Sequence, residues 1–468
     1  MRMSCRLRLI FRLAAAAIAA YGIAACAGSS TGATNGGMLP HPLLPLARAS
    51  RHITHVVVMI QENRSFDNLF ATFPGADGTT HGLMKTPSGD VIVQLQAVPL
   101  VELCDFSHGY VGFRQDYDRG IMDGFGLEGG GRKCPGHAGT RPYQYVDPTQ
   151  ITPYWSIAQQ YVLADHFFQT QGSGSFTAHQ DLISGGSTID RNKTQTLVDF
   201  PTHKPWGCDA RSGTDTSLLV ATGSVLKREY GRGPFPCLDY ETLRDLLDAK
   251  GISWKYYSPP EPQGTGSRWN AFDAIKVVRE GPEWQTNIAL ETSIFSDISG
   301  GTLPTVSWIV PDNPNSDHPG HNHDTGPSWV ASVVNAIGES AYWKSTAVVV
   351  VWDDWGGFYD HEPPPFFDRW GGLGFRVPML VISAYSRQSS PTHGGYISHT
   401  QYEFGSIVKF IEDVWHLGRL GTTDVRAASI IDCFDFAQPP RKFNLIPARY
   451  SRSYFQHQRP SFAPIDTE

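Results

Sequence analysis

The feature that most constrains this chain is a set of short apolar runs, rich in β-branched and aliphatic residues, separated by longer segments with helical patterning. Each run is followed by polar residues at its carboxyl end. Continuous apolar runs of this kind are typical of strands covered on both faces, as in a parallel sheet packed between helices. The sequence therefore predicts an α/β fold with a largely parallel central sheet flanked by helices. The clearest runs are residues 55–60, 251–257, 305–310, 346–352 and 377–383.

Helices are predicted over residues 243–250, 328–337 and 402–417. In the last of these segments the apolar residues recur on one helical face, which we expect to pack in the core. Residues 124–143 and 199–236 are rich in glycine, proline and aromatic residues and show no clean periodicity. We expect these two stretches to be long loop insertions over the rigid scaffold, where selectivity for a ligand usually resides.

The N-terminus has the layout of a targeting segment. Residues 1–25 combine a basic start, an apolar stretch and small residues at the end, which predicts a signal peptide and export to the periplasm, the cell envelope or the medium. Cys26 follows Ile23-Ala24-Ala25, as in a bacterial lipoprotein processing site, so membrane attachment through a lipidated Cys26 and ordinary cleavage both stay open. Residues 26–50 are expected to be a flexible tether, and residues 51–468 a single domain with insertions.

The cysteines are expected to be structural. Five remain after Cys26, and an odd number in an oxidising compartment leaves at least one unpaired. The pairs that lie close in sequence are Cys104 with Cys134 and Cys208 with Cys237, which leaves Cys433 free. None of the spacings resembles a zinc ribbon.

The charge of the chain excludes one class of partner. The formal net charge is −7, and removal of the leader with its four arginines makes it more negative still. A negative surface repels the phosphate backbone, so a nucleic-acid partner is not expected.

Two polar pairs directly follow two of the predicted strands. Glu62 and Asn63 follow the run at 55–60, and Asp353 and Asp354 follow the run at 346–352. Open parallel sheets bind ligands beyond the carboxyl ends of their strands, and adjacent carboxylates repel each other unless a cation lies beside them. Oxygen ligands of this kind suit a hard divalent cation. The alternatives are a loop cap for the first pair, and solvation with helix capping for the second.

Ser175 and three histidines are the candidates for catalysis. Ser175 lies at a glycine-rich entry to a predicted helix, where unpaired backbone N–H groups attract phosphate. A serine hydroxyl is a weak nucleophile unless a base or a cation activates it. His108, His318 and His361 lie in loop segments, and histidine can donate a proton or stabilise charge near neutral pH. For each of these residues a turn-forming serine or a solvated surface histidine is the plain alternative.

Read together, these segments resemble the bacterial phosphoesterase family that includes secreted phospholipases C and acid phosphatases, within the alkaline-phosphatase-like fold. The resemblance covers about residues 52–417 and depends on six motifs in order. They are HVVVMIQENRSFDNLF, DRGIMDGF, LADHFF with the loop around Ser175 and LISG, SWIVPDNPNSDHP, VVVWDDWGGFYDHEPPP, and YEFGSIVKFIEDVW.

The resemblance implies a metal-dependent phosphoric-ester hydrolase with a phosphoserine intermediate on Ser175. It places His108 and His318 around the phosphoryl group, and His361, in the patterned segment FYDH, is a further catalytic candidate. It implies one divalent metal ion, whose identity stays open among magnesium, calcium, manganese, zinc and iron. The implied ligands are Glu62, Asn63, Ser175, Asp353 and Asp354.

Departures from the family pattern affect the expected substrate more than the chemistry. The loop GSGSFTAHQ lacks the prolines that relatives carry, Phe404 stands where a histidine is frequent, and C-terminal β-domains like those of the larger phospholipases are not expected. We expect an acid-phosphatase-like phosphomonoesterase. The alternatives are a phospholipase C acting on phospholipid head groups and an inactive surface lipoprotein that binds phosphorylated ligands. A sulfatase is disfavoured because the loop lacks the motif that forms formylglycine.

Overall fold

The computed structural model describes residues 43–190, 192–222, 225–259, 269–365, 372–390, 394–459 and 461. The predicted signal peptide, Cys26 and the first part of the predicted tether lie outside these residues. Residues 43–50 of that tether are not a linker, because they form the first part of helix α1 (Leu43–His52). Ala49 of α1 is fully buried in the main core, so packing against the scaffold stabilises this helix. Within the described part of the chain, no helix has the length and apolarity that crossing a membrane requires.

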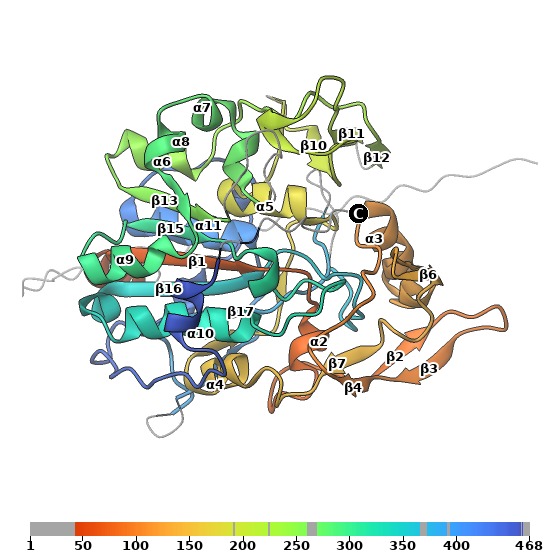
Figure 1. Cartoon of the computed structure of the whole chain (residues 1–468), viewed down its shortest axis with the longest axis horizontal. Helices are drawn as coiled ribbons and strands as arrows, with labels where there is room; N and C mark the ends of the chain where they lie inside the picture. The colour runs from red at the N-terminus through yellow and green to blue at the C-terminus, as the bar shows by residue number, and fades with distance from the viewer. Residues whose placement is uncertain are drawn as a thin grey trace, which may run out of the picture. The chain divides into compact units, whose positions relative to one another are not determined.

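An eight-stranded sheet forms the centre of the fold, and its strands follow the order β14-β13-β15-β1-β16-β17-β8-β18 (Figure 1). Every pairing in this sheet is parallel except the two made by β17, which confirms the prediction of a largely parallel sheet. In the order of the sheet, the strands are β14 (Ile288–Leu290), β13 (Trp254–Ser258), β15 (Val306–Ile309), β1 (His55–Gln61), β16 (Thr346–Trp352), β17 (Met379–Ser383), β8 (Val162–Ala164) and β18 (Tyr396–Ser398).

Strand β17, which forms in the run predicted at 377–383, is antiparallel to both of its neighbours in this largely parallel sheet. Met379, its first residue, pairs with Val351 near the end of β16 and with Ala164 at the end of β8. The start of β17 therefore lies at the edge where the other strands end. As a result Arg376, which precedes β17, lies at this edge together with the residues that follow β8 and β16.

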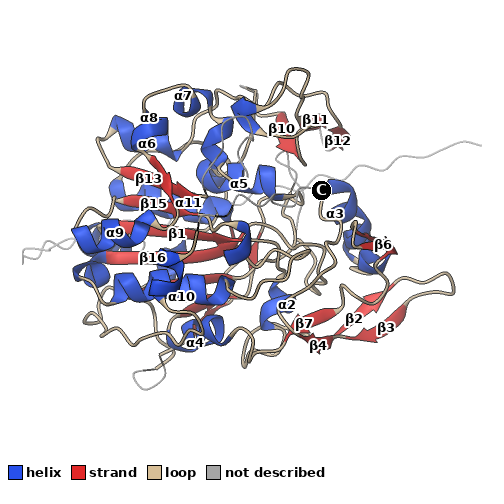
Figure 2. Ribbon diagram, viewed as in Figure 1, coloured by secondary structure: helices blue, strands red, loops and turns tan. Residues whose placement is uncertain are grey.

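Helices cover both faces of the sheet, as Figure 2 shows. Helix α11 (Phe404–Trp415) packs with α5 (Ser175–Ser184) and α1, and α10 (Gly326–Gly338) packs with α4 (Thr152–Gln160) and α9 (Ser293–Gly300). The three predicted helices are confirmed as α6 (Leu243–Ala249), α10 and α11, with small shifts at their ends. Ile407, Phe410, Ile411 and Val414 of α11 are buried, as the helical pattern predicts.

The two stretches predicted as long loop insertions contain short regular elements. Residues 199–236 include β11 (Ser217–Thr222) and β12 (Val225–Glu229), which form an antiparallel sheet with β10 (Gln195–Val198). Residues 124–143 include β5 (Gly129–Gly130) and β6 (Cys134–His137). Such strands are short and partly exposed, so their sequence alternation is weak. The predicted disulfides Cys104–Cys134 and Cys208–Cys237 are present, and Cys433 is buried without a disulfide partner.

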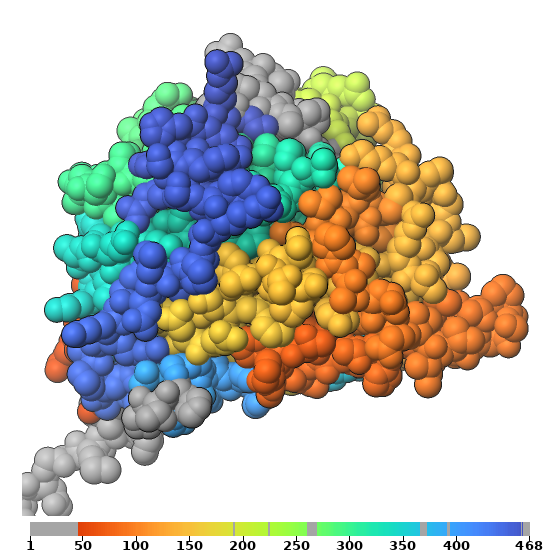
Figure 3. Space-filling view, turned by 60° about the horizontal axis from the view of Figure 1, so that its bottom comes forward, coloured from red at the N-terminus to blue at the C-terminus, as the bar shows by residue number. Residues whose placement is uncertain are grey.

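Smaller elements surround this scaffold. In Figure 3 the segment that contains the antiparallel strands β2 and β3 projects from the surface. In chain order, the remaining helices and strands are α2 (Phe66–Phe70), β2 (His81–Met84), β3 (Val91–Gln94), β4 (Gln96–Val98), α3 (Tyr110–Tyr117), β7 (Gln144–Val146), β9 (Phe167–Phe168), α7 (Lys276–Arg279), α8 (Glu283–Thr286), β19 (Tyr402–Glu403) and α12 (Arg452–His457).

Candidate functional site

The two polar pairs predicted at strand ends lie side by side. β1 and β16 are parallel neighbours in register up to Gln61 and Trp352, so Glu62-Asn63 and Asp353-Asp354 leave the sheet together. The backbone N–H of Asn63 donates to Asp353 Oδ1 over 2.9 Å. Gly356 is required nearby, because a Cβ atom at this position would lie 2.3 Å from the carbonyl oxygen of Asn63.

The two aspartates each accept backbone N–H groups through their Oδ1 atom. Asp353 Oδ1 accepts the N–H groups of Asn63 and Asp354, and Asp354 Oδ1 accepts the N–H of Gly356. Three further oxygens, Glu62 Oε2, Asn63 Oδ1 and Asp353 Oδ2, are buried and accept no hydrogen bond from any described residue. Burial, followed by the charge of Asp353, raises the pKa of Glu62 well above its usual value. A cation among these oxygens would remove that electrostatic cost.

Ser175 joins this group from the start of helix α5. Its Oγ donates a hydrogen bond to Asp354 Oδ2 over 3.2 Å, and the residue is only 2% exposed. Gly174 precedes the helix, and a Cβ atom there would lie 2.2 Å from the ring of Phe200. The prediction of a glycine-rich entry to a helix is therefore confirmed, and the N–H groups of the first turn of α5 have no partner within the helix.

Two of the three predicted histidines lie beside this group. His108 Nδ1 donates to the carbonyl oxygen of Phe106 over 2.7 Å, so its Nε2 accepts from the Asn63 amide over 2.9 Å. The same Nε2 lies 4.0 Å from Asp354 Oδ2. The His318 ring lies 6.1 Å from that of His108 and stacks on Trp269. Both histidines are buried, so neither is a solvated surface residue.

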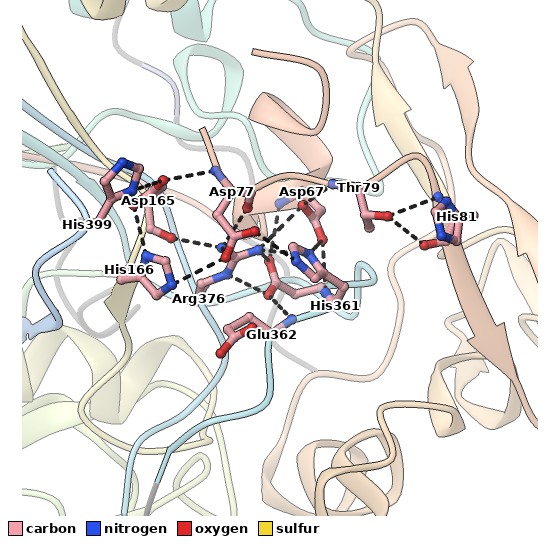
Figure 4. Close-up of polar contacts among 11 residues, drawn as sticks. Asp67, Asp77, Thr79, His81, Asp165, His166, His361, Glu362, Arg376 and His399 are labelled. Carbon is pink, nitrogen blue, oxygen red and sulfur yellow. Dashed lines mark hydrogen bonds and ion pairs between the residues drawn. The ribbon is translucent and has the colours of Figure 1, made fainter. Parts of the chain in front are cut away.

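His361 belongs to a different group of polar residues, which Figure 4 shows in close-up. Its Nδ1 lies 2.7 Å from Asp67 Oδ2 and 3.1 Å from an Arg376 nitrogen, and its Nε2 lies 3.4 Å from Asp77 Oδ1. Asp360 pairs with Arg376 in the same group. The structure therefore places His361 with buried ion pairs and does not bring it together with Ser175.

This placement predicts that His361 makes stability depend on pH. Burial lowers the pKa of His361, but the hydrogen bond and charge of Asp67 and the charge of Asp360 outweigh burial and Arg376, and the pKa rises to about 9. Because the folded pKa exceeds the ordinary value of 6.5, the charged form stabilises the fold fully below pH 6.5, and this contribution is lost as the pH rises through 9. We expect a loss of about 3 kcal/mol in unfolding free energy over this range.

Urea unfolding at a series of pH values from 6 to 10 checks this expectation, with His361→Gln as the comparison. The variant should be less stable at pH 6 and should lose less stability than the unchanged chain as the pH rises. An identical pH profile for the two proteins would show that His361 does not carry the dependence.

His179 lies beside the site and is not among the residues predicted from the sequence. His179 lies one turn after Ser175 on α5, with its Nε2 3.1 Å from Glu62 Oε1 and 3.7 Å from Asp353 Oδ2. Burial lowers the pKa of His179 to about 4, so the ring is neutral at pH 7. Glu62, His179 and Asp353 are spaced closely enough to hold a metal ion. The sequence feature that could have identified His179 is its spacing of four residues from Ser175, which places both side chains on one helical face.

Comparison with known proteins identifies relatives over most of the chain. Residues 53–418 match the model of the Phosphoesterase family. The non-hemolytic phospholipase C of Burkholderia pseudomallei is 24% identical over 89% of this chain, and the match spans 64% of that relative, less than two thirds of its length. Phospholipase C A of Mycobacterium tuberculosis is 26% identical over 83% of this chain and 78% of its own length.

Further matches include a plant protein, over a shorter part of the chain, and a solved structure. Non-specific phospholipase C1 of Arabidopsis thaliana is 29% identical over 47% of this chain and 44% of its own. A solved protein of the alkaline phosphatase superfamily from Vibrio parahaemolyticus matches 83% of this chain and 79% of its own, at 10% identity and a TM-score of 0.32. The family match spans well over half of the sequence, and it confirms the predicted class of enzyme, a hydrolase of phosphoester bonds. The chain belongs to the Phosphoesterase family.

Proposed function

We propose that this protein is a metal-dependent hydrolase of phosphoric esters that forms a phosphoserine on Ser175 and cleaves it with water. The observation that carries the proposal is the hydrogen bond of 3.2 Å from Ser175 Oγ to Asp354 Oδ2, within the buried group at the ends of β1 and β16. A serine hydroxyl at the start of a helix, beside carboxylates with oxygens that accept no hydrogen bond, is suited to attack phosphorus.

The residues of this group fit a hard divalent cation. They supply carboxylate and amide oxygens, and three of these oxygens accept no hydrogen bond from the described residues. A bound divalent ion would neutralise phosphoryl charge and favour the ionised form of the serine hydroxyl. We propose that Glu62, Asn63, Asp353 and Asp354 hold one such ion together with Ser175. We also propose that His179 either orients the carboxylate of Glu62 or is itself a ligand of the ion.

The chemistry of the chain's own residues follows from this arrangement. Ser175 Oγ gives up its proton to Asp354 Oδ2, which accepts its hydrogen bond, and forms a bond to phosphorus while the bond from phosphorus to the ester oxygen breaks. The leaving oxygen then takes up a proton. Water subsequently forms a bond to phosphorus as the bond to Ser175 Oγ breaks, and phosphate is released. The first-turn N–H groups of α5 are positioned to stabilise the charge on phosphoryl oxygens.

His108 is the residue best placed to serve the leaving oxygen. Its Nδ1 is engaged by the Phe106 carbonyl, so the orientation of the ring is fixed and Nε2 faces Asn63 and Asp354. When Nε2 is protonated it can donate that proton to the ester oxygen. We propose that His318, which is buried beside His108, binds the phosphoryl group from the same side.

The proposed substrate is a phosphomonoester, as the family resemblance with acid phosphatases implies. A second candidate, a phospholipase C that cleaves phospholipid head groups, is favoured by the names of relatives that match 83–89% of this chain. The two candidates share the site and its nucleophile and differ in the group that leaves with phosphorus.

We also propose that the protein is exported, on the evidence of the predicted signal at residues 1–25. The two disulfides support an oxidising compartment, because such bonds do not persist in the reducing cytosol. Whether Cys26 is lipidated does not affect the proposed chemistry.

Parallel assays of p-nitrophenyl phosphate and p-nitrophenyl phosphorylcholine test the proposal on the chain without its leader. We expect hydrolysis of the monoester, complete loss of turnover after treatment with a chelator, and recovery on adding back a divalent metal ion. Preferential cleavage of the phosphorylcholine ester would instead select the phospholipase. A metal panel that restores no turnover of either ester would overturn the proposal and favour a protein that only binds phosphorylated ligands.

A further inference from the structure

A cavity of about 520 Å³ opens beside the proposed phosphoryl site. Ser107 and Gly109, which flank His108, form part of its wall, and Phe200 forms another part. The Phe200 ring lies 6.2 Å from the His108 ring and fills the space that a side chain at position 174 would need. The cavity therefore adjoins both the predicted nucleophile loop and the residue that faces the leaving oxygen.

Asp199 connects the wall of this cavity to the nucleophile loop. Its backbone N–H donates to Ser173 Oγ over 2.7 Å, two residues before Ser175. Its side chain accepts from the backbone N–H of Tyr110 through Oδ1 and from Arg228 Nε through Oδ2. A ligand held in the cavity is thus held at a defined position relative to Ser175.

The charges that line the cavity are mainly positive. Lys204, Arg211 and Arg228 contribute three cations, and Asp199, the acidic residue of the lining, is already paired with Arg228. Lys204 and Arg211 are exposed at the cavity, and Arg211 forms no ion pair with any described residue. The cavity therefore attracts an anion and repels a cation.

Aromatic side chains form the other part of the lining. Phe200 and Trp206 stack with their ring centroids 5.1 Å apart, and Tyr110 and Tyr230 line the same cavity. Aromatic faces of this kind bind flat apolar groups, and next to cations they are suited to a ligand that is both flat and negatively charged. A quaternary ammonium group would also fit aromatic rings, but here it would meet three cations and one paired carboxylate.

We infer that this cavity binds the leaving group of the substrate, and that the preferred leaving group carries a negative charge on a flat apolar framework. The inference depends on the proposed function for the position of the transferred phosphoryl group. It goes beyond that function by naming the substrate class: phosphomonoesters whose leaving group is anionic, in preference to esters of neutral or cationic alcohols.

Three aryl esters whose rings carry no charge, a negative charge or a positive charge test the inference: phenyl phosphate, 3-carboxyphenyl phosphate and 3-(trimethylammoniomethyl)phenyl phosphate, respectively. We expect kcat/KM to be highest for the carboxylated ester, by about threefold to tenfold over phenyl phosphate, and lowest for the cationic ester. In the double variant Lys204→Gln/Arg211→Gln, the ratio of kcat/KM for the carboxylated ester to kcat/KM for phenyl phosphate should fall towards one. The control Arg51→Gln/Lys250→Gln removes the same charge from exposed positions outside the cavity and should keep the preference.

Equal kcat/KM values for the three esters, or a preference that persists in the cavity variant, would overturn the inference. Calorimetric binding of the same esters separates this failure from failure of the proposed function. If the unchanged chain hydrolyses none of them, the proposed phosphomonoesterase function is wrong. Tighter binding of the carboxylated ester that is lost in the cavity variant would still support the anion site, and equal affinities would overturn it.

Discussion

Replacing Ser175 with alanine is expected to lower kcat for phosphoester hydrolysis by about 10³-fold or more, because the variant has no oxygen to form the covalent intermediate. The fold should change little. The substitution removes one buried hydrogen bond, from Ser175 Oγ to Asp354 Oδ2, which costs about 1 kcal/mol of stability. Glu62, Asn63 and Asp353 keep their oxygens in this variant, so metal binding should persist. Turnover and calorimetric metal titration, made on the same preparation, measure the two effects separately.

Ser184→Ala is the matched control for this experiment. Ser184 is a buried serine at the other end of α5, and its Oγ donates to the carbonyl oxygen of Gln180. We expect this variant to lose a similar amount of stability and to keep turnover within about threefold. Acid quenching with a substrate labelled on phosphorus should trap a phosphoprotein in the unchanged chain and none in Ser175→Ala. More than a tenth of the normal activity in Ser175→Ala would show that water or another side chain attacks phosphorus.

Replacing Arg376 with methionine is expected to destabilise the fold by about 3–5 kcal/mol, because two buried carboxylates would lose their compensating charge. Arg376 is fully buried, with Nε 2.8 Å from Asp360 Oδ1 and a further contact to Asp67 Oδ1 at 3.5 Å. It also donates to the backbone carbonyl oxygens of Asp77 and Asp165, so it joins segments that are far apart in sequence. Chemical denaturation measures the change in unfolding free energy.

A second variant separates the loss of charge balance from the loss of packing. Arg376→Met combined with Asp360→Asn removes one unpaired carboxylate and should be more stable than Arg376→Met alone. Lys227→Met serves as the surface control, since Lys227 is 72% exposed and pairs with Glu229 at 2.9 Å. We expect the control to change stability by less than about 0.5 kcal/mol. An effect of Arg376→Met as small as that of Lys227→Met would show that the buried network adds no more than a surface ion pair.

The apolar runs of the sequence predicted the sheet well because a strand buried on both faces must be apolar along its whole length. Residues 346–352 form β16 with unchanged bounds, and residues 55–60 form all but the last residue of β1. Adjacency of Glu62-Asn63 to Asp353-Asp354 followed from the same argument, since parallel strands end at one edge. The direction of β17 did not follow, because an antiparallel strand inside a covered sheet has the same apolar pattern as a parallel one.

The insertions show a second limit of sequence reasoning. β11 and β12 lie in a stretch without clean periodicity, because β11 is buried only in its first half and every residue of β12 is exposed or half-buried. The cavity beside His108 depends on this stretch. Its cations come from residues 204, 211 and 228, which have no common sequence pattern and meet only because Asp199 and the short strands bring them together.

By itself, the sequence determined the α/β class, the two polar strand ends and the helical entry at Ser175, because each depends on neighbouring residues or on a strict repeat. It also predicted the two disulfides, because each joins the cysteines that lie nearest in sequence. Only the tertiary structure decided which histidine meets which carboxylate. His108 and His318 lie beside Asn63 and Asp354, His179 contacts Glu62, and His361 pairs with Asp67. Histidine side chains in loops and on helix faces carry no signal of their partner, because contact depends on chain segments that only folding brings within hydrogen-bonding distance.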